Sequence, residues 1–523
     1  MKHNNEKTGA VHVPQVRDAI LRQLEDCWSG EWTCVQFDGD EVRFVRKSAA
    51  PIIRKEQRKR LQAREALRTC AVRLALQCSV DLLRRHWQYD CTWRNVQRCY
   101  RWLCAAVPTS TFAPNVLKGA HCELESKVQQ LLSTYLGKGW ITPNSENEVW
   151  LRLGVDGTLV WQTGVESITL SFAHIEVTDK PQLVHVIALA VGHESRDMLD
   201  DVFSSVQIKS TFVWNNNNFC SIQARLFVCC DHMARVRLRQ CSGATARASE
   251  LRMCPYCDLT PSEIRRADTP DTTQILQVDR RFGIPSMQNP PELLHLTLNV
   301  LKFLLRHMAK LVYPRHATAS QRVATEWLHL ASPTRACSDH SAAVCFIRKD
   351  GWRLLEHKLW RHLTHDRVGH SNMQLPRRAL WLSCNILNSL FKMKLTSEET
   401  RRISRQCNWL RCILSNLRWS LSIWVHILVV HVPSYVEQWG SLRLFSTYAV
   451  EGSHRWLKKG FRLSMKSTTP RYGSRTGLQE ILHTDTAKLE LVRRFNCDTL
   501  LLGRGRFHID EECISEDLLS LIV

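Results

Sequence analysis

The stretch Leu151-Arg-Leu-Gly-Val-Asp-Gly-Thr158 places an acidic residue, Asp156, in the middle of a run of strand-forming residues. It belongs to the first of three successive runs that are rich in Val, Ile, Leu and Thr and separated by short turn segments. These runs are 149–160, 167–177 and 183–192. They predict an antiparallel meander. Residues 195–206 then show the apolar spacing of an amphipathic helix, for which Ser195 is the predicted N-cap, and 224–230 return to a strand.

Two aspartates lie on these predicted strands. Asp156 is in the first, and Asp231 follows the apolar run 226–230 of the fourth. Burying a carboxylate there is costly unless a cation or partner neutralises it. Neighbouring strands lie about 4.7 to 4.9 Å apart, so the two carboxylates can share a divalent ion, and a third from a helix can complete a two-metal site. The alternatives are structural, because Asp156 beside Gly157 would open a turn and Asp231 would cap the following helix.

Glu451 is the best third acid. It is the one acid among seven Lys and Arg in the segment 445–475. Glu451 and three bases follow one another at spacings of three or four residues, which places them on one face of a helix. These bases are Arg455, Lys458 and Arg462, and Lys459 adjoins them. The rival acids Glu437, Glu166, Asp179, Asp197, Asp200 and Asp201 are expected in turns or on a solvent-facing helix.

This arrangement resembles a known family. Three strands, a helix, a strand, a long helical stretch and a glutamate-bearing helix resemble the ribonuclease H-like plan of DDE transposases. Within that group, Cys254-x-x-Cys257 after the second aspartate and His426-x4-His431 before the glutamate are similar to the core of Transib-type transposases and the V(D)J recombinase catalytic subunit. The resemblance covers roughly 149–475. The chain departs from the recombinase in the compact spacing of the aspartates, 231 − 156 = 75 residues, and in having no ring-finger pattern before the core.

The resemblance implies two kinds of metal site. Asp156, Asp231 and Glu451 would bind Mg²⁺ or Mn²⁺, and Cys254, Cys257, His426 and His431 would hold a structural zinc ion. Either pair of zinc ligands alone has little weight, because 21 cysteines and 22 histidines give about one such pair of each kind by chance. Together they form a Cys₂His₂ set suited to zinc, with buried structural Cys and His as the alternative. Residues five apart on an ideal α-helix point about 140° apart, so the helix must end or distort near Pro433.

The expected fold class is α/β: a ribonuclease H-like mixed sheet interrupted by a large all-α insertion, with an N-terminal helical region. We divide the chain into an unassigned segment 1–45, a basic helical region 46–140, the first part of the core 141–260, the insertion 261–420, the second part of the core 421–475 and a tail 476–523. His295 lies inside the apolar pattern of the insertion and is interpreted as a core histidine.

Charge points to a polyanionic partner. The chain has 71 Lys and Arg against 50 Asp and Glu, a net charge of +21, and residues 41–70 alone carry ten bases and three acids. The bases expected to bind DNA there are Arg54, Lys55, Arg58, Lys59 and Arg60. The alternative is a solvated basic face on a helical bundle. A nuclear localisation signal fits either reading.

Several function classes are excluded. The longest apolar run, 421–432, is shorter than the roughly 18 to 20 residues of a membrane span, the N-terminal residues lack the apolar core of a secretory signal, and no G-x-x-x-x-G-K-[ST] loop predicts an NTP-driven motor. With the basic charge, the resemblance implies a nuclear DNA transposase or recombinase. The resemblance implies double-stranded DNA with terminal inverted repeats as partner and a homodimer or higher oligomer. The alternatives are a catalytically silent, transposase-derived DNA-binding protein and a structure-specific nuclease.

Overall fold

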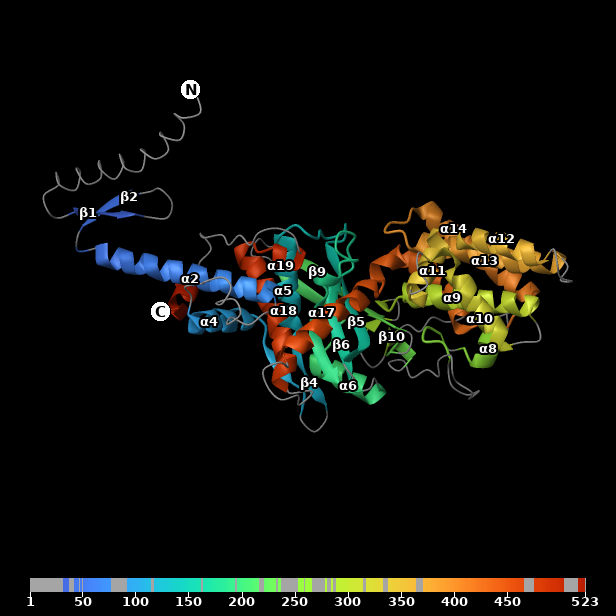
Figure 1. The fold of residues 1–523 in the computed structure, drawn as a ribbon, viewed down its shortest axis with the longest axis horizontal. Helices are drawn as coiled ribbons and strands as arrows, with labels where there is room; N and C mark the ends of the chain where they lie inside the picture. The colour runs from blue at the N-terminus through green and yellow to red at the C-terminus, as the bar shows by residue number, and fades with distance from the viewer. Residues whose placement is uncertain are drawn as a thin grey trace, which may run out of the picture. The chain divides into compact units, whose positions relative to one another are not determined.

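The computed structural model describes residues 32–36, 42–46, 48, 50–76, 92–113, 117–160, 163–192, 195–215, 221–231, 234–236, 253–257, 259–265, 278–279, 284–285, 288–313, 317–332, 337–363, 370–464, 475–502 and 516–522. The protein is mixed α/β (Figure 1). By its contacts it divides into two units, Met1–Ala105 with Glu490–Val523, and Ala106–Leu489.

A seven-stranded mixed sheet forms one part of the Ala106–Leu489 unit. Its strands are β3 (Thr109–Thr111), β4 (Lys118–Cys122), β5 (Glu148–Val160), β6 (Thr163–Phe172), β7 (His185–Val191), β8 (Thr211–Asn215) and β9 (Ser221–Cys230), in the order β3-β4-β7-β6-β5-β9-β8. The pairs β5–β6 and β6–β7 are antiparallel, which confirms the predicted meander. Strand β9 pairs with β5 in parallel, after helix α6 (Arg196–Val206). The predicted cap of α6 is confirmed, because Ser195 Oγ accepts from Met198 N at 3.2 Å.

Helices α5 (Leu124–Gly137), α17 (Tyr448–Ser464) and α18 (Arg475–Phe495) accompany the sheet. Leu457 of α17 and three apolar residues of α18 share one core with β4, β6 and β7. Near its start α17 also packs on β5 and on the short 3₁₀-helix η1 (Pro181–Leu183). Gly154 permits this approach, because a Cβ atom there would lie 2.8 Å from Val450 Cγ2. The start of α17 is therefore fixed against the middle of β5.

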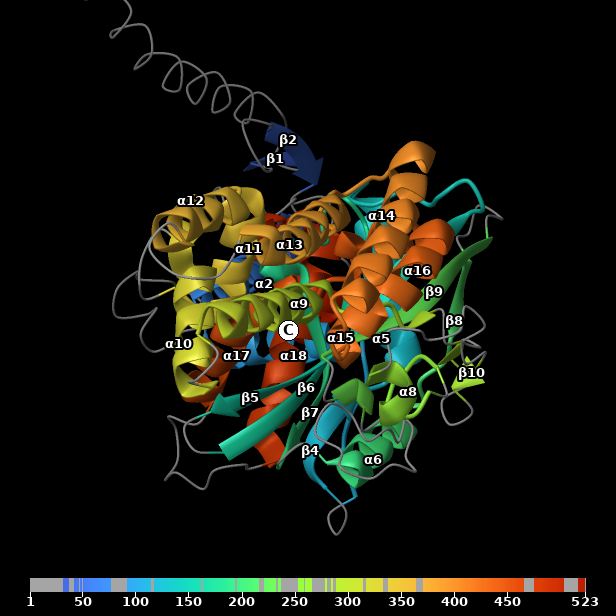
Figure 2. The same ribbon diagram turned by 90° about the vertical axis from the view of Figure 1, so that its right-hand side faces the viewer.

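The other part of this unit is a group of helices with one large core (Figures 1 and 2, yellow to orange). They are α8 (Pro261–Arg265), α9 (Leu293–Val312), α10 (Ala317–Leu328), α11 (Asp339–Arg348), α12 (Gly351–Leu363), α13 (His370–Leu390), α14 (Ser397–Asn416), α15 (Ile423–His426) and α16 (Val432–Trp439), with the shorter turns η4 (His329–Ala331) and η6 (Leu442–Phe445). A short strand pair, β10 (Val278–Asp279) with β11 (Ile284–Pro285), also falls within 261–420. The described part of that segment is therefore largely, but not entirely, helical.

The Met1–Ala105 and Glu490–Val523 unit contains a hairpin and a small helical cluster. Strands β1 (Trp32–Gln36) and β2 (Val42–Arg46) pair at the end of the segment that the sequence left unassigned, and β2 extends one residue beyond it. Helix α2 (Ala50–Leu76) packs on α4 (Trp93–Cys104) and on α19 (Thr499–Leu502) and α20 (Glu516–Ile522). Among the described helices of the chain, none is both long and apolar enough to cross a membrane.

Candidate functional site

The two aspartates occupy neighbouring positions on paired parallel strands. Val155 of β5 pairs with Cys230 of β9, and each is followed at once by an aspartate, Asp156 and Asp231. The parallel register thus places two residues that are 75 positions apart in sequence side by side, at the point where the pairing of β5 with β9 ends. The sequence predicted this adjacency because both acids follow apolar strand residues.

Glu451 reaches the same side of β5 from helix α17. It lies in the first turn of α17, directly after Val450, whose side chain covers Gly154. Gly154 and Asp156 are two residues apart on a strand and so share one face of the sheet. The start of α17 therefore covers the face on which Asp156 lies.

The three acids influence one another electrostatically. Burial raises the pKa of Asp156 to about 8, and the charges of Glu451, Asp231 and Glu166 add to this effect. Burial likewise raises the pKa of Glu451 to about 7, with further contributions from Glu292 and Asp231. Carboxyl groups with such values retain protons near neutral pH unless a cation neutralises the cluster. A bound cation would lower this electrostatic cost.

The acids are not drawn together to the spacing of metal ligands. Among the described residues, that spacing is found in a different group, Cys254, Cys257, His426 and His431. Asp231 Oδ1 also accepts a hydrogen bond from Ala234 N at 2.7 Å, so the helix-capping role considered for Asp231 is realised. A carboxylate has two oxygens, so capping leaves acceptor capacity for a cation. The roles of Asp156, Asp231 and Glu451 as metal ligands stay a prediction.

Sequence reasoning missed the part that His295 plays at this site. Its side chain is 24% exposed, and its Nδ1 lies 2.8 Å from Oε2 of the buried Glu292. Burial lowers the pKa of His295, but Glu292, Glu451 and Asp231 outweigh burial and raise it to about 9. His295 is therefore a cation beside the acids and not an ordinary core histidine. The acid three positions before it, in Pro290-Pro291-Glu292-Leu-Leu-His295, was the signal that could have indicated this pair.

A second histidine, His454, lies beside Asp156. It follows Glu451 by three residues on α17, and its Nε2 is 3.6 Å from Asp156 Oδ2. Burial, and next the charge of Lys458, lower the pKa of His454 to about 4, so the ring is neutral. No described residue makes a hydrogen bond with its shielded Nε2. No sequence motif pointed to it.

Two buried side chains hold the start of α17 in place. Arg152 on β5 is 1% exposed and donates to the Ser446 carbonyl at 2.9 Å, the Thr178 carbonyl at 2.8 Å and Ser171 Oγ at 3.1 Å. Glu292 Oε1 accepts from Thr447 N at 3.4 Å. Both contacts fall just before α17 and tie Glu451 to the strand that carries Asp156 and to the helix that carries His295.

The zinc ligands predicted from the sequence come together in the core of the helical part. Cys254 Sγ lies 3.4 Å from His431 Nε2, Cys257 Sγ lies 3.4 Å from His426 Nε2, and the two Nε2 atoms are 3.1 Å apart. All four side chains are buried, and their ligand atoms lie within 4.8 Å of one another. Two thiols and two imidazoles at these spacings fit tetrahedral zinc. The Cys₂His₂ cluster can therefore bind a metal such as zinc.

A π-helical turn explains how residues five apart share one face. Residues Ile427–His431 form the π-helix η5, in which the Val432 N–H bonds to the Ile427 carbonyl. The i→i+5 bonds place His426 and His431 on the same side of the chain. The distortion expected near Pro433 is thus present but lies just before it, and Pro433 occupies the start of α16.

Arg235 connects this cluster to the end of β9. Its guanidinium is buried and donates to the Tyr256 hydroxyl, between the two cysteines, and to the Cys230 carbonyl at 3.1 Å. It also donates to Asn289 Oδ1 at 2.9 Å. One side chain therefore links the Cys254–Cys257 loop to the strand that leads to Asp231. The sequence carried no signal for this role.

The predicted DNA-binding residues lie on two helices. Arg54, Lys55, Arg58 and Arg60 are exposed on α2, and Lys59 is half-buried. Lys458 is half-buried on α17. The backbones of Arg455, Lys459 and Arg462 belong to α17, but their side chains lie outside the described part of the structure.

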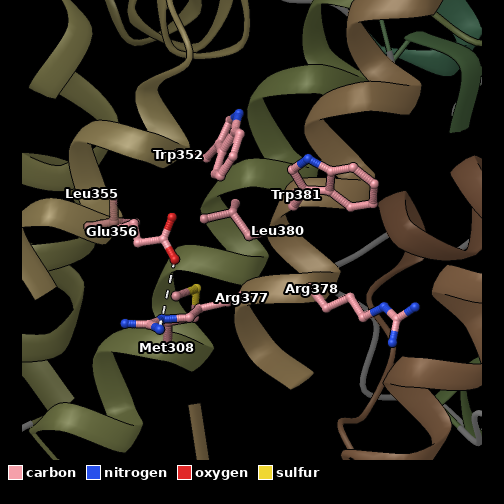
Figure 3. A pocket seen from close by; sticks show the side chains of 8 residues that line it. All are labelled: Met308, Trp352, Leu355, Glu356, Arg377, Arg378, Leu380 and Trp381. Atoms are coloured by element: carbon pink, nitrogen blue, oxygen red, sulfur yellow. Dashed lines mark ion pairs between the residues drawn. The ribbon is translucent and has the colours of Figure 1, made fainter. Parts of the chain in front are cut away.

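A cavity in the helical part is separate from these sites (Figure 3). It has a volume of about 210 Å³ and is lined by Trp352, Trp381, apolar side chains and the ion pair Arg377–Glu356, with 3.8 Å between its charged atoms. Its lining residue Met308 is 13 residues beyond His295 on α9, about 20 Å at 1.5 Å per residue. None of the predicted catalytic, metal-binding or DNA-binding residues lines the cavity.

Comparison with models of protein families and with curated proteins gave no match for this chain.

Proposed function

We propose that the chain is a DDE-type transposase or recombinase that cleaves and transfers DNA strands with two divalent ions. The observation that carries the proposal is the placement of three acids. Asp156 and Asp231 follow paired residues of two parallel strands, and Glu451 joins them from a helix packed on the first strand, close enough to raise the pKa of Asp156. Three acids on this combination of elements are what two-metal phosphodiester chemistry requires.

The sheet order supports a ribonuclease H-like core. Strands β7-β6-β5-β9 are consecutive neighbours, β9 alone is parallel to β5, and α6 lies between β7 and β9 in sequence. The helical segment 261–420 falls between the second aspartate and the glutamate, where the family's insertion would be expected. The Cys₂His₂ cluster supports the same assignment, because it joins the two ends of that segment.

Different residues of the site would have different roles in this reaction. Asp156, Asp231 and Glu451 would bind Mg²⁺ or Mn²⁺, and the bound ions would activate the attacking hydroxyl and stabilise the leaving oxygen. His295, with a pKa raised to about 9, would offer positive charge to a phosphate near the acids. Arg152 and Glu292 would keep Glu451 in position through the start of α17. No covalent protein nucleophile is needed.

The net charge of +21 supports double-stranded DNA as partner. Terminal inverted repeats as the sequence recognised, a homodimer or higher oligomer as the working form and a nuclear location belong to the same proposal. Arg54, Lys55, Arg58, Lys59 and Arg60 on α2, with Arg455, Lys458, Lys459 and Arg462 on α17, would contact the phosphates.

The test uses labelled duplexes made from the inverted repeats of the DNA that flanks the gene, with Mg²⁺ or Mn²⁺. We expect Asp156→Asn, Asp231→Asn and Glu451→Gln to lower cleavage and strand joining by at least about a hundredfold. DNA binding in a gel-shift assay should persist. Glu437→Gln is the matched control, because Glu437 is an exposed acid on α16.

Two outcomes would replace the proposal. Wild-type protein that binds these duplexes without cutting them would be a silent, transposase-derived DNA-binding protein. Cleavage of junctions or RNA–DNA hybrids without strand joining would indicate a structure-specific nuclease.

A further inference from the structure

We infer that His454 supplies a nitrogen ligand to the ion held by Asp156 and thereby favours Mn²⁺ over Mg²⁺. The inference rests on the proposed function, because it deepens the description of the same metal site.

His454 Nε2 and Asp156 Oδ2 are 3.6 Å apart. This is longer than the roughly 2.7 to 3.2 Å of a hydrogen bond to nitrogen. Two ligands that each lie about 2.1 Å from one ion can be up to about 4.2 Å apart. The separation therefore suits two ligands of one cation better than a direct bond between the two side chains.

Among the described residues, His454 Nε2 has no hydrogen-bond partner that would compete with a metal ion. The atom is shielded from solvent. A shielded polar atom without a partner is costly, so a ligand that occupies this position would be stabilising. An imidazole nitrogen can offer its lone pair to a metal, whereas the ammonium group of a lysine such as Lys458 can only donate.

The position of His454 on its helix supports the same inference. It follows Glu451 by three residues on α17, and residues three apart lie on one face of a helix. Glu451 and His454 therefore approach β5 together, where Asp156 lies. One helical face would provide an oxygen donor and a nitrogen donor to the same region.

The consequence concerns which metal is bound. Mg²⁺ strongly prefers oxygen ligands and retains its waters, whereas transition metals accept imidazole. Mn²⁺ binds carboxylates as Mg²⁺ does, but it is a transition metal, and a nitrogen ligand strengthens its binding. A site with His454 should therefore hold Mn²⁺ more tightly than its acids alone would.

The test measures metal binding directly on zinc-loaded full-length protein without DNA. Electron paramagnetic resonance gives the Mn²⁺ affinity, and its pulsed form detects the nuclear modulation of a coordinated imidazole nitrogen. We expect the wild-type protein to show this modulation and His454→Gln to lose it, with Mn²⁺ affinity reduced at least about tenfold. Mg²⁺ affinity, measured by competition, should change much less. His307→Gln is the matched control, because His307 on α9 bonds to the Phe303 carbonyl of its own helix at 2.9 Å.

A second variant guards against a folding defect. His454→Glu replaces the nitrogen donor with an oxygen donor, and we expect it to restore binding while shifting the preference toward Mg²⁺. Persistence of the nitrogen modulation in His454→Gln, or unchanged Mn²⁺ affinity in a folded variant, would overturn the inference and leave the proposed function standing. Mn²⁺ binding that Asp156→Asn does not affect would instead overturn the metal site of the proposed function.

Discussion

The Nε2 atoms of His426 and His431 lie 3.1 Å apart across a π-helical turn, each beside one cysteine of the Cys254–Cys257 loop. Two buried imidazole nitrogens this close cannot both act as acceptors without a donor or a cation between them. A bound metal removes this conflict and neutralises the thiolates. The relationship leads directly to a stability prediction.

We expect about one zinc ion per chain by metal analysis of the purified protein, and a large loss of stability when a ligand is removed. Cys254→Ala or His431→Ala should lower the free energy of unfolding by at least about 3 kcal/mol, because metal binding contributes to folding. Cys384→Ala is the control, since Cys384 is buried in the same core but is not a ligand. Zinc-free protein with a ligand variant no less stable than the control would contradict the assignment.

The raised pKa of Asp156 predicts a stability cost that depends on pH. A carboxyl whose pKa rises from near 3.8 to about 8 on folding binds its proton more tightly in the folded state. Its stabilising contribution is complete below the unfolded pKa and is lost as pH rises toward 8. Without divalent ions, Asp156→Asn should therefore gain stability over wild type between pH 5 and 9, by about 1 kcal/mol or more. Urea unfolding across this range measures the gain.

Two controls test whether the pH-dependent gain in stability comes from the charge of Asp156. Asp197→Asn changes an exposed acid on α6 and should show no comparable gain with pH. Adding Mn²⁺ should stabilise the wild type more than Asp156→Asn and so shrink the difference between them. A gain that is constant across the pH range would mean that the substitution acts by packing alone.

A buried ion pair under the sheet gives a third prediction. Lys127 Nζ lies 2.8 Å from Asp485 Oδ2, and His185 Nδ1 lies 3.0 Å from Asp485 Oδ1. Despite burial, Lys127 and His185 hold the pKa of Asp485 far below its ordinary range. Asp485→Asn should cost about 3 to 5 kcal/mol, because it leaves Lys127 as an uncompensated buried charge.

The double variant Lys127→Met with Asp485→Asn tests the cause of this loss. Removing both charges should recover part of the stability lost in the single variant. Double-mutant analysis of urea unfolding at pH 7 gives the coupling. A double variant as unstable as the sum of the single ones would show that the two side chains act independently.

The exposed bases of α2 predict strong salt dependence of DNA binding. Arg58, Lys59 and Arg60 lie in a part of α2, residues 51–62, in which no described residue is buried. Each phosphate contact contributes about −0.9 to the slope of log K against log salt, so replacing these three by Ala should flatten the slope by about two to three units. Cleavage by the saturated complex should stay nearly unchanged, because phosphate contacts position the DNA.

A charge-matched control lies on α14. Arg401, Arg402 and Arg405 are exposed but pair with Glu398 or Glu399, so their replacement by Ala should leave the salt slope almost unaltered. Equal effects of the two triple variants would mean that net charge, and not the position of α2, determines binding.

The parts of the fold that the sequence predicted share a local cause. The meander β5–β6–β7 follows from apolar runs and turns within each strand, and the closeness of Asp156 to Asp231 follows from the parallel pairing of two such runs. His454 and Arg152 escaped prediction because their partners come from distant segments. The partner of Arg152, the Ser446 carbonyl, is 294 residues away in sequence. Sequence pattern indicates burial, but it does not indicate which distant polar group a buried side chain will meet.

The π-helical turn also shows why the zinc ligands were easier to predict than their geometry. Spacing alone required a distortion between His426 and the residues that follow, and it was expected near Pro433 because proline interrupts helices. The structure places it at Ile427–His431, just before Pro433, where the two rings must meet the cysteines. The position was set by a tertiary requirement and not by the residue with the strongest local effect.

The π-helical turn determines the direction in which the side chains of the following helix, α16, point. A π turn contains one residue more than an α-helical path, and one residue corresponds to a rotation of about 100°. Val432, Tyr435 and Val436 of α16 are buried with this extra rotation in place. Deleting one residue of η5 would keep both histidines on one side, as an i, i+4 pair, yet swing that apolar face away from the core. The length of this short segment, more than the identity of its apolar side chains, therefore sets the frame in which the chain continues toward α17 and Glu451.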